Sequence, residues 1–435
     1  MDKMIKDLPG ITGSRSNSAP YFPMALLVIP IGQLGAAVTG SSSPAFWAAF
    51  SLMLFVAAQV AVGARPLRPS HYWVGLLACL LLYSYAFPSV TTFAPPIQST
   101  GLTEMLIGLG VLAAAIASPL QPRKLVNVIA LTGGITATYV LIAGDYASGR
   151  LEGLGINCNY LGALLAIPCV AAVAMGRRKP AWLIPAGICL VAIFETQSRG
   201  AFLATAVGIF IVFVQSRPRL VQVFLTVIAI AVTALLPGTL ANFADVLAAD
   251  RSASELSHNT ATRKAVAEFA VRVIAEHPVR GIGYGLFPSY AAESPDFGIY
   301  MATHNDYLRL AAESGVISLA AFLALIWLGI RGRRSDDLAI LRGLLFTYMT
   351  VLVFVNVLTT PIVSVPFWLS LGCLLATRPA NETAHASPWP ADHPATEEAH
   401  EHAFAHGLAG GRRTLTDAHL RKPRHLSSME IGSRK

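Results

Sequence analysis

The sequence predicts an all-α, polytopic membrane protein with about twelve transmembrane helices and one long periplasmic loop that itself contains helices. Hydrophobic residues make up 54% of the chain and charged residues only 13%, whereas soluble domains carry about 25% charged residues. The apolar residues form a series of runs of about 17 to 25 residues, the length that spans a bilayer. The Lys and Arg residues gather in short segments between these runs.

The apolar runs define the expected spans. Membrane helices tolerate internal Pro and Gly better than soluble helices, so Pro168 and Pro185 do not interrupt the series. The division between the seventh and eighth spans rests only on the polar stretch from Glu195 to Gly200. The spans are expected to begin near Met24, Ala45, His71, Leu102, Lys124, Asn159, Ala181, Gly200, Arg219, Asn305, Leu338 and Pro361.

The basic residues predict the orientation of the chain. They fall in every second loop, and in the short loops of the other set the basic residues are Arg150 and Arg199. Basic loops stay in the cytoplasm, so both termini are expected there. The net charge of +8 is therefore a topology signal and does not indicate binding to nucleic acid.

Four segments follow from this reading. Residues 1–236 would hold about nine N-terminal spans, 237–303 a periplasmic loop with an amphipathic helix, and 304–376 about three C-terminal spans. The polar residues 377–435 are expected to form a disordered cytoplasmic tail. No cytoplasmic loop is long enough for a nucleotide-sugar-binding domain, which argues against a transferase that uses such a donor directly.

Arg199 belongs to the first of three polar groups on the expected periplasmic side. It lies in the segment Glu195-Thr-Gln-Ser-Arg-Gly-Ala201 and breaks the charge pattern that the other loops obey. Because a guanidinium pairs well with phosphate oxygens, Arg199 is a candidate anion contact. The alternative is an ion pair with Glu195, four residues earlier on the same helical face.

The second polar group is an amphipathic helix in the long loop. Its apolar stripe consists of Val266, Phe269, Ala270, Val273 and Ile274, and an exposed ladder of alternating charge consists of Lys264, Glu268, Arg272 and Glu276. Arg263 lies off this ladder, in the expected first turn behind a cap at Asn259 or Thr260. A cation at a helix N-terminus is unfavourable because it opposes the helix dipole, and a bound anion at that end would compensate for it. The alternative is that Arg263 is simply exposed to solvent.

A Gly-rich segment, Gly281-Ile-Gly-Tyr-Gly-Leu-Phe-Pro288, follows this helix. No strand is expected before it and no helix signal follows, so the dinucleotide-binding fingerprint lacks its structural context. We predict a turn that folds the loop back over the membrane. Arg280, just before the glycines, is a candidate supporting residue of the site.

The third polar group runs from Thr303 directly into an apolar span. His304 falls at the expected helix start, where the dipole disfavours imidazolium, so a neutral ring able to act as a general base is expected. Asp306, Arg309 and Glu313 follow within the next turns, and the last two can pair. A polar cap or headgroup contact is the alternative reading of His304.

Taken together and in this order, the three groups resemble the O-antigen ligase and polymerase superfamily. The motifs are Ser198-Arg-Gly-Ala201, Thr262-Arg263 with His277-Pro and the Gly-rich segment, and His304-Asn-Asp-Tyr-Leu with Glu313-Ser-Gly315. They span about Glu195 to Ile330.

The resemblance implies a glycosyltransferase of the bacterial inner membrane with a periplasmic active site. Its donor would be a glycan on undecaprenyl pyrophosphate and its acceptor the lipid A-core or a growing glycan, with no cofactor, no metal and no nucleotide. Arg199 and Arg263 would bind the pyrophosphate and His304 would be the catalytic base. Arg280, Asp306, Arg309 and Glu313 would support them. A single displacement would invert the anomeric carbon.

Other functions remain open at this point. An O-antigen or exopolysaccharide polymerase shares the motifs and differs in the acceptor; the single compact loop favours the ligase. A lipid-linked glycan transporter would need charges near the bilayer midplane or broken helices in corresponding halves. A non-catalytic scaffold gives no reason for Arg199 to break the charge pattern.

Overall fold

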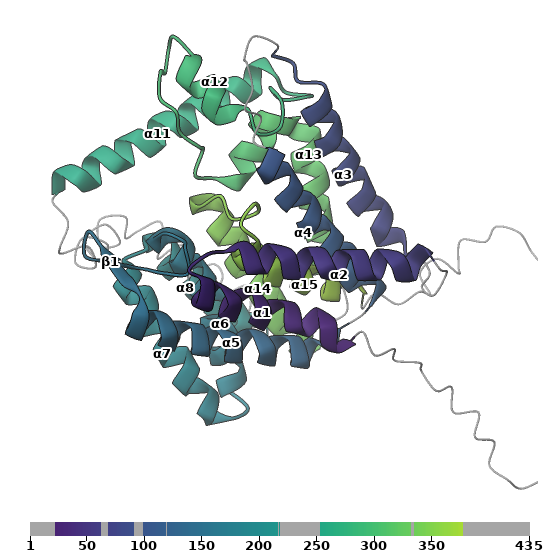
Figure 1. Ribbon diagram of the computed structural model, residues 1–435, viewed down its shortest axis with the longest axis vertical. Helices are drawn as coiled ribbons and strands as arrows, with labels where there is room; N and C mark the ends of the chain where they lie inside the picture. Colours follow the sequence, from purple (N-terminus) through teal and green to yellow (C-terminus); the bar gives the residue numbers. More distant parts are fainter. Residues whose placement is uncertain are drawn as a thin grey trace, which may run out of the picture. The chain divides into compact units, whose positions relative to one another are not determined.

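A computed structural model describes residues 22–61, 68–90, 99–118, 120–215, 217, 253–331 and 335–376, all within one compact unit, Met1–Arg378. This part of the chain is mostly helical, as predicted (Figure 1). The α-helices are α1 (Phe22–Thr39), α2 (Ser43–Ala61), α3 (Pro69–Ala86), α4 (Ser99–Ala117), α5 (Pro122–Ala143), α6 (Cys158–Gly176), α7 (Leu183–Thr196), α8 (Arg199–Gln215), α11 (Ala253–Glu276), α12 (Phe287–Glu293), α13 (Asp306–Ile330), α14 (Asp336–Phe354) and α15 (Pro361–Ala376). A short 3-10 helix, η1 (Pro180–Trp182), precedes α7, and the strands β1 (Asp145–Ala147) and β2 (Arg150–Glu152) form an antiparallel hairpin.

In the described part of the chain, five helices are long and apolar enough to cross a membrane: Thr100–Ala117, Pro122–Ala143, Cys158–Gly176, Asp306–Ile330 and Asp336–Phe354. Five shorter apolar helices accompany them. A described helix covers each predicted span except the one expected from Arg219, which lies outside the described residues, as does the tail from residue 377. The helices thus indicate a multi-pass membrane protein, while the total of about twelve spans and the side on which the loop lies remain predictions.

The apolar helices pack closely on one another. An aromatic cluster of Phe322, Tyr348, Phe367 and Trp368 joins α13, α14 and α15, with neighbouring ring centroids 4.7 to 6.2 Å apart. Between α8 and α14, a Cβ on Gly208 would clash with the Thr347 hydroxyl. Small residues let membrane helices approach in this way, so the sequence's frequent Gly and Ala inside spans serve the packing.

Helix α13 is kinked at Gly315, whose φ is 80° and ψ is 165°. The segment after α11 lies against the kink and forms hydrogen bonds with backbone groups that have no partner within the interrupted helix. The N–H of Val316 donates to the Pro278 carbonyl at 2.8 Å, and the N–H of Gly283 donates to the Glu313 carbonyl at 2.9 Å. The predicted turn is therefore present, and it is attached to the helix that follows His304.

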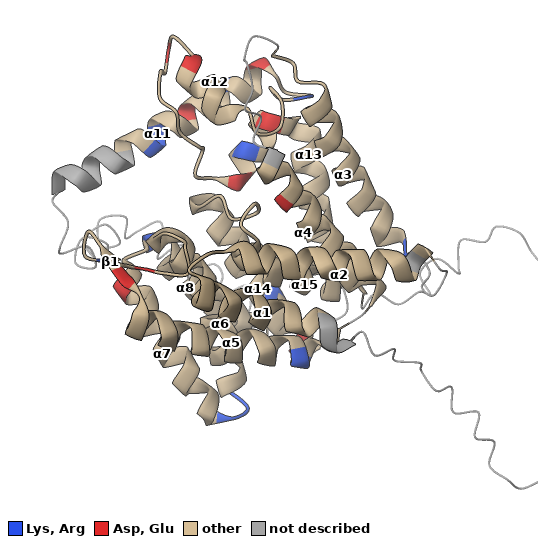
Figure 2. Cartoon of the chain, in the orientation of Figure 1, with Lys and Arg blue, Asp and Glu red and all other residues tan. Residues whose placement is uncertain are grey.

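Helix α11 confirms the predicted two-faced pattern. Val266, Phe269, Ala270 and Val273 are buried against α12, the Gly-rich turn and α13. The Lys264 and Glu268 side chains are exposed and form an ion pair with an N–O distance of 3.7 Å. Among the described residues, charged side chains concentrate at helix ends and around α11, α12 and the start of α13, and the other helices carry few (Figure 2).

Candidate active site

His304 lies in the turn immediately before α13. Asn305 is the N-cap of that helix: its side-chain oxygen accepts hydrogen bonds from the N–H groups of Tyr307 at 3.0 Å and Leu308 at 3.1 Å. His304 therefore stands outside the first helical turn, with its backbone in the left-handed region at φ 53°. That conformation is uncommon for a residue other than Gly and, where it occurs, clusters at functional sites.

The surroundings of His304 favour the neutral form of its ring. Burial lowers the pKa of His304 below its ordinary value, and the positive charge of Arg263 lowers it further. The sequence ascribed the neutral ring to the dipole of α13; in the structure His304 lies one residue before the N-cap Asn305. Burial and a neighbouring guanidinium add to the preference for the neutral imidazole that a general base needs.

Arg263 acts on His304 from α11. That helix begins at Ala253, so Arg263 lies in its third turn and not in the first turn, as the sequence suggested. Residues 253–262 contain no Gly or Pro that would stop the helix before Asn259. The argument from an unfavourable helix dipole is therefore wrong for Arg263, but the structure does bring this cation to the candidate base.

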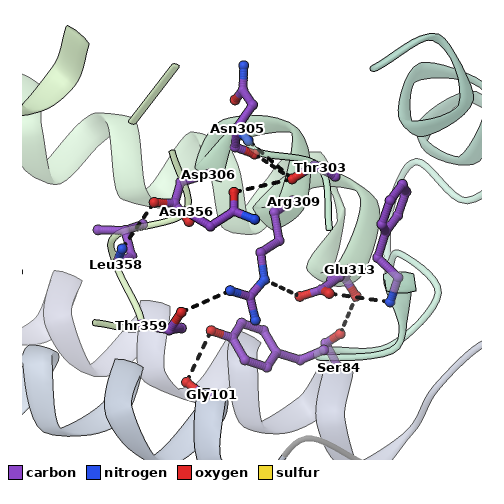
Figure 3. Close-up of polar contacts among 12 residues, drawn as sticks. Ser84, Gly101, Thr303, Asn305, Asp306, Arg309, Glu313, Asn356, Leu358 and Thr359 are labelled. Atoms are coloured by element: carbon purple, nitrogen blue, oxygen red, sulfur yellow. Dashed lines mark hydrogen bonds and ion pairs between the residues drawn. The ribbon is translucent and has the colours of Figure 1, made fainter. Parts of the chain in front are cut away.

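Arg309 and Glu313 form a buried ion pair, as their spacing predicted. The Arg309 Nε lies 3.1 Å from the Glu313 Oε2, and the two side chains are 12% and 1% exposed. The Arg309 Nη1 also donates to the Thr359 hydroxyl at 3.0 Å. Figure 3 shows the Arg309 side chain between Glu313 and Thr359. The guanidinium thus links α13 to the loop before α15.

Asp306 is buried and has a positioning role in the fold. Its Oδ2 accepts hydrogen bonds from the N–H groups of Val357 at 2.6 Å and Leu358 at 3.0 Å. Thr303 reaches the same loop, with its hydroxyl 3.4 Å from the Asn356 Oδ1 (Figure 3). The start of α13 and the loop between α14 and α15 are therefore held together on both sides of His304.

Arg199 begins α8, directly after a break in the chain direction. Gln197 adopts the left-handed conformation that ends α7, and the Arg199 side chain is exposed. The buried Arg150 fixes this turn: its Nε donates to the Thr196 carbonyl and its Nη2 to the Asn159 Oδ1, both at 3.0 Å. No ion pair between Arg199 and Glu195 is found among the described residues, so the alternative reading of Arg199 gains no support.

Arg280 lies on the far side of the Gly-rich turn. Its Nη2 donates to the Phe87 carbonyl at 2.9 Å, and its guanidinium lies 5.5 Å from the centre of the Tyr83 ring. These contacts attach the turn to the end of α3. In the described part of the chain Arg280 makes no contact with His304.

A cavity of about 420 Å³ opens beside Thr303 and the Arg309–Glu313 pair. Such a volume lies in the range of ligand-binding pockets. Its described lining comes from α4, α6, α12, α13 and the loops before α13 and α15, through Thr100, Gly101, Glu104, Tyr160, Phe287, Pro288, Tyr300, Met301, Ala302, Thr303, Arg309, Glu313, Asn356 and Thr359. The candidate base therefore stands next to a polar chamber.

Residues 184–323 match a family model described as O-antigen ligase. Over this segment the chain is similar to the O-antigen ligase family. The resemblance read from the sequence is thereby confirmed, since the matched region begins in α7, ends inside α13 and includes every predicted site residue from Arg199 to Glu313. Comparison with curated proteins gives no match.

Residues outside the matched segment 184–323 complete the cavity. Glu104 and Tyr160, from α4 and α6, line it together with Asn356 and Thr359, and sequence reasoning singled out none of these. Glu104 carried a usable signal, since a carboxyl group inside an apolar run marks a functional position. No three His, Cys, Asp or Glu side chains gather as a metal site in the described part of the chain.

Proposed function

We propose that this protein is an O-antigen ligase-type glycosyltransferase. It would move a glycan from undecaprenyl pyrophosphate to the lipid A-core on the periplasmic face of the bacterial inner membrane. The observation that carries the proposal is that burial and the positive charge of Arg263 lower the pKa of His304, within a segment that matches the O-antigen ligase family. A base and an anion-binding group are the two functions that transfer from a pyrophosphate donor requires.

His304 acts as the general base in the proposed reaction. Its unprotonated ring nitrogen takes the proton from the acceptor hydroxyl as that oxygen attacks the anomeric carbon of the donor glycan. The bond between the anomeric carbon and the pyrophosphate oxygen breaks, and the electron pair leaves with the pyrophosphate. One displacement of this kind inverts the anomeric carbon.

Arg199 and Arg263 stabilise the leaving group. Each guanidinium offers paired donors to phosphate oxygens, and fixed cations aimed at developing charge contribute several kcal/mol to such a step. Arg263 has a second effect because its charge favours the neutral form of His304. The same residue would then bind the leaving group and keep the base unprotonated.

Deletion of the gene in its own host tests the function. The readouts are lipopolysaccharide on a gel and an assay of secreted polysaccharide. Lipid A-core without O-antigen, with lipid-linked O-antigen accumulating, is the result expected for a ligase. Core carrying a single repeat would instead indicate an O-antigen polymerase, and loss of a secreted polymer with normal lipopolysaccharide would indicate an exopolysaccharide polymerase.

A further inference from the structure

Glu104 is the charged residue of the cavity that the proposed reaction leaves without a role. It lies on α4, in a helix apolar enough to cross a membrane, and it lines the cavity beside Thr303 and Arg309. An ionisable side chain in such a helix is costly and marks a functional position. Among the described residues, the Glu104 carboxyl group has neither a hydrogen bond nor an ion pair, and it is only partly buried because it faces the cavity.

The other two charged groups of the cavity already satisfy each other. Arg309 gives its Nε to Glu313 at 3.1 Å and its Nη1 to Thr359 at 3.0 Å. The remaining Glu313 oxygen accepts from the Phe287 N–H at 3.3 Å. Arg309 also attracts Glu104, but its guanidinium is in direct contact with the Glu313 carboxylate. Of the charged groups in the described lining, Glu104 is therefore the one left to hydrogen-bond a ligand.

The described lining of the cavity offers no unpaired cation to the donor's pyrophosphate. This lining holds two carboxyl groups and a single guanidinium, and that guanidinium is paired. The proposed pyrophosphate ligands, Arg199 and Arg263, are not among the lining residues. The hydroxyl groups of a sugar suit this chamber, because carboxyl, hydroxyl and amide groups are what such a ligand can hydrogen-bond.

A second cavity of about 360 Å³ shares Thr100 and Glu104 with the first. It is lined at the start of α2 by the hydroxyl groups of Ser42 and Ser43 and by the Trp47 ring. Glu104 thus stands between two chambers rich in hydroxyl groups. A glycan longer than one sugar unit can occupy the first chamber near Thr303 and extend past Glu104 into the second.

We propose that Glu104 is an acceptor-binding residue whose carboxyl group hydrogen-bonds hydroxyl groups of the acceptor glycan in this cavity. The inference deepens the proposed function and rests on it. It separates the two substrates: the donor pyrophosphate binds at Arg199 and Arg263, and the sugar that carries the attacking hydroxyl binds between α4 and α13.

Kinetics with the full-length purified protein test this role. The donor is lipid-linked O-antigen and the acceptor lipid A-core, both extracted from the deletion strain. Glu104→Ala is expected to raise the acceptor KM about tenfold or more, since a hydrogen bond to a charged group is lost, and to leave the donor KM within about twofold. Glu104→Gln keeps an oxygen at the same place and should recover part of the loss. Glu268→Ala, an exposed Glu of α11, should change neither constant.

Carbodiimide labelling of the wild-type protein gives a test that does not depend on a variant folding. Lipid A-core should slow the modification of Glu104 several-fold, the lipid-linked donor should not, and Glu268 should be modified at the same rate throughout. An unchanged acceptor KM in Glu104→Ala, or protection of Glu104 by the donor instead, would overturn the inference while wild-type transfer continued. Absence of transfer by the wild-type protein would contradict the proposed function itself.

Discussion

Arg150 and Thr196 join the β1–β2 hairpin to the end of α7, through a hydrogen bond of 3.0 Å from the Arg150 Nε to the Thr196 carbonyl. The Arg150 side chain is buried, and it also donates to Asn159. The bond holds the turn from which α8 and its first residue, Arg199, begin. Arg150 is one of the two basic residues that break the predicted charge pattern of the short loops. Its position is explained by this contact, which holds the turn before Arg199.

The Arg150→Met variant should therefore use the donor less well, although Arg150 itself is not proposed to contact the donor. We expect the donor KM to rise about tenfold, because the buried Thr196 and the partly buried Asn159 lose their hydrogen-bond partner at a cost of about 1–3 kcal/mol. Kinetics with the purified protein measure this effect. Arg123→Met, at an exposed position at the start of α5, is the matched control. An unchanged donor KM in Arg150→Met would show that the turn keeps its shape without the bond.

The Arg309–Glu313 pair should contribute more to stability than to chemistry. Arg309→Met leaves the Glu313 carboxylate, 1% exposed, without its partner, and breaking a buried pair costs about 3–5 kcal/mol. The double variant Arg309→Met/Glu313→Gln should be more stable than Arg309→Met, because it removes both charges. Thermal unfolding of the four proteins of this cycle in detergent measures the coupling. Additive losses would contradict a direct interaction between the two residues.

Periodicity predicted the parts of the fold in which one face of a helix decides the structure. The stripe from Val266 to Val273 is buried and the Lys264–Glu268 face is exposed, because amphipathic spacing alone determines which side packs. The same reasoning placed Arg309 and Glu313 four residues apart on one face. Local spacing therefore sufficed wherever the partners lie on the same helix.

Features that depend on contacts between distant segments could not be predicted from the sequence. The start of α11 at Ala253 was missed because Asn259 and Thr260 are good caps that also occur inside helices. The cavity joins Glu104 to Arg309, more than two hundred residues later, and no local pattern links these positions. Tertiary contacts decided both cases.

His304→Ala should abolish transfer while leaving donor binding intact. A general base contributes about 10²–10⁴-fold to the rate, and the Arg residues proposed to bind the pyrophosphate are unchanged in this variant. Transfer and donor binding are measured separately with lipid-linked O-antigen. His277→Ala removes another imidazole, at the end of α11 and bonded to Ser89, and should keep the activity. Wild-type rates from His304→Ala would remove the assignment of the base.

Chelation by EDTA should leave the transfer rate unchanged. The proposed reaction uses the guanidinium groups of Arg199 and Arg263 where other transferases use a metal ion to neutralise a leaving pyrophosphate. Initial rates are compared before and after dialysis against EDTA, and again after Mg²⁺ or Mn²⁺ is returned. Strong inhibition that either cation reverses would contradict a metal-independent site.

The pH dependence of transfer should report the pair of His304 and Arg263. The base must be unprotonated, and its pKa lies below the ordinary 6.5 because burial and the Arg263 charge both disfavour imidazolium. Activity should therefore persist at pH 6.5 and fall only at lower pH. Arg263→Gln removes one of the two causes, so the pKa of His304 should rise and the acid limb of kcat/KM should move to higher pH. Arg272→Gln, at an exposed position further along α11, should leave the acid limb of kcat/KM at the same pH. An acid limb that stays put in Arg263→Gln would mean that burial alone keeps His304 neutral, and Arg263 would then act on the donor only.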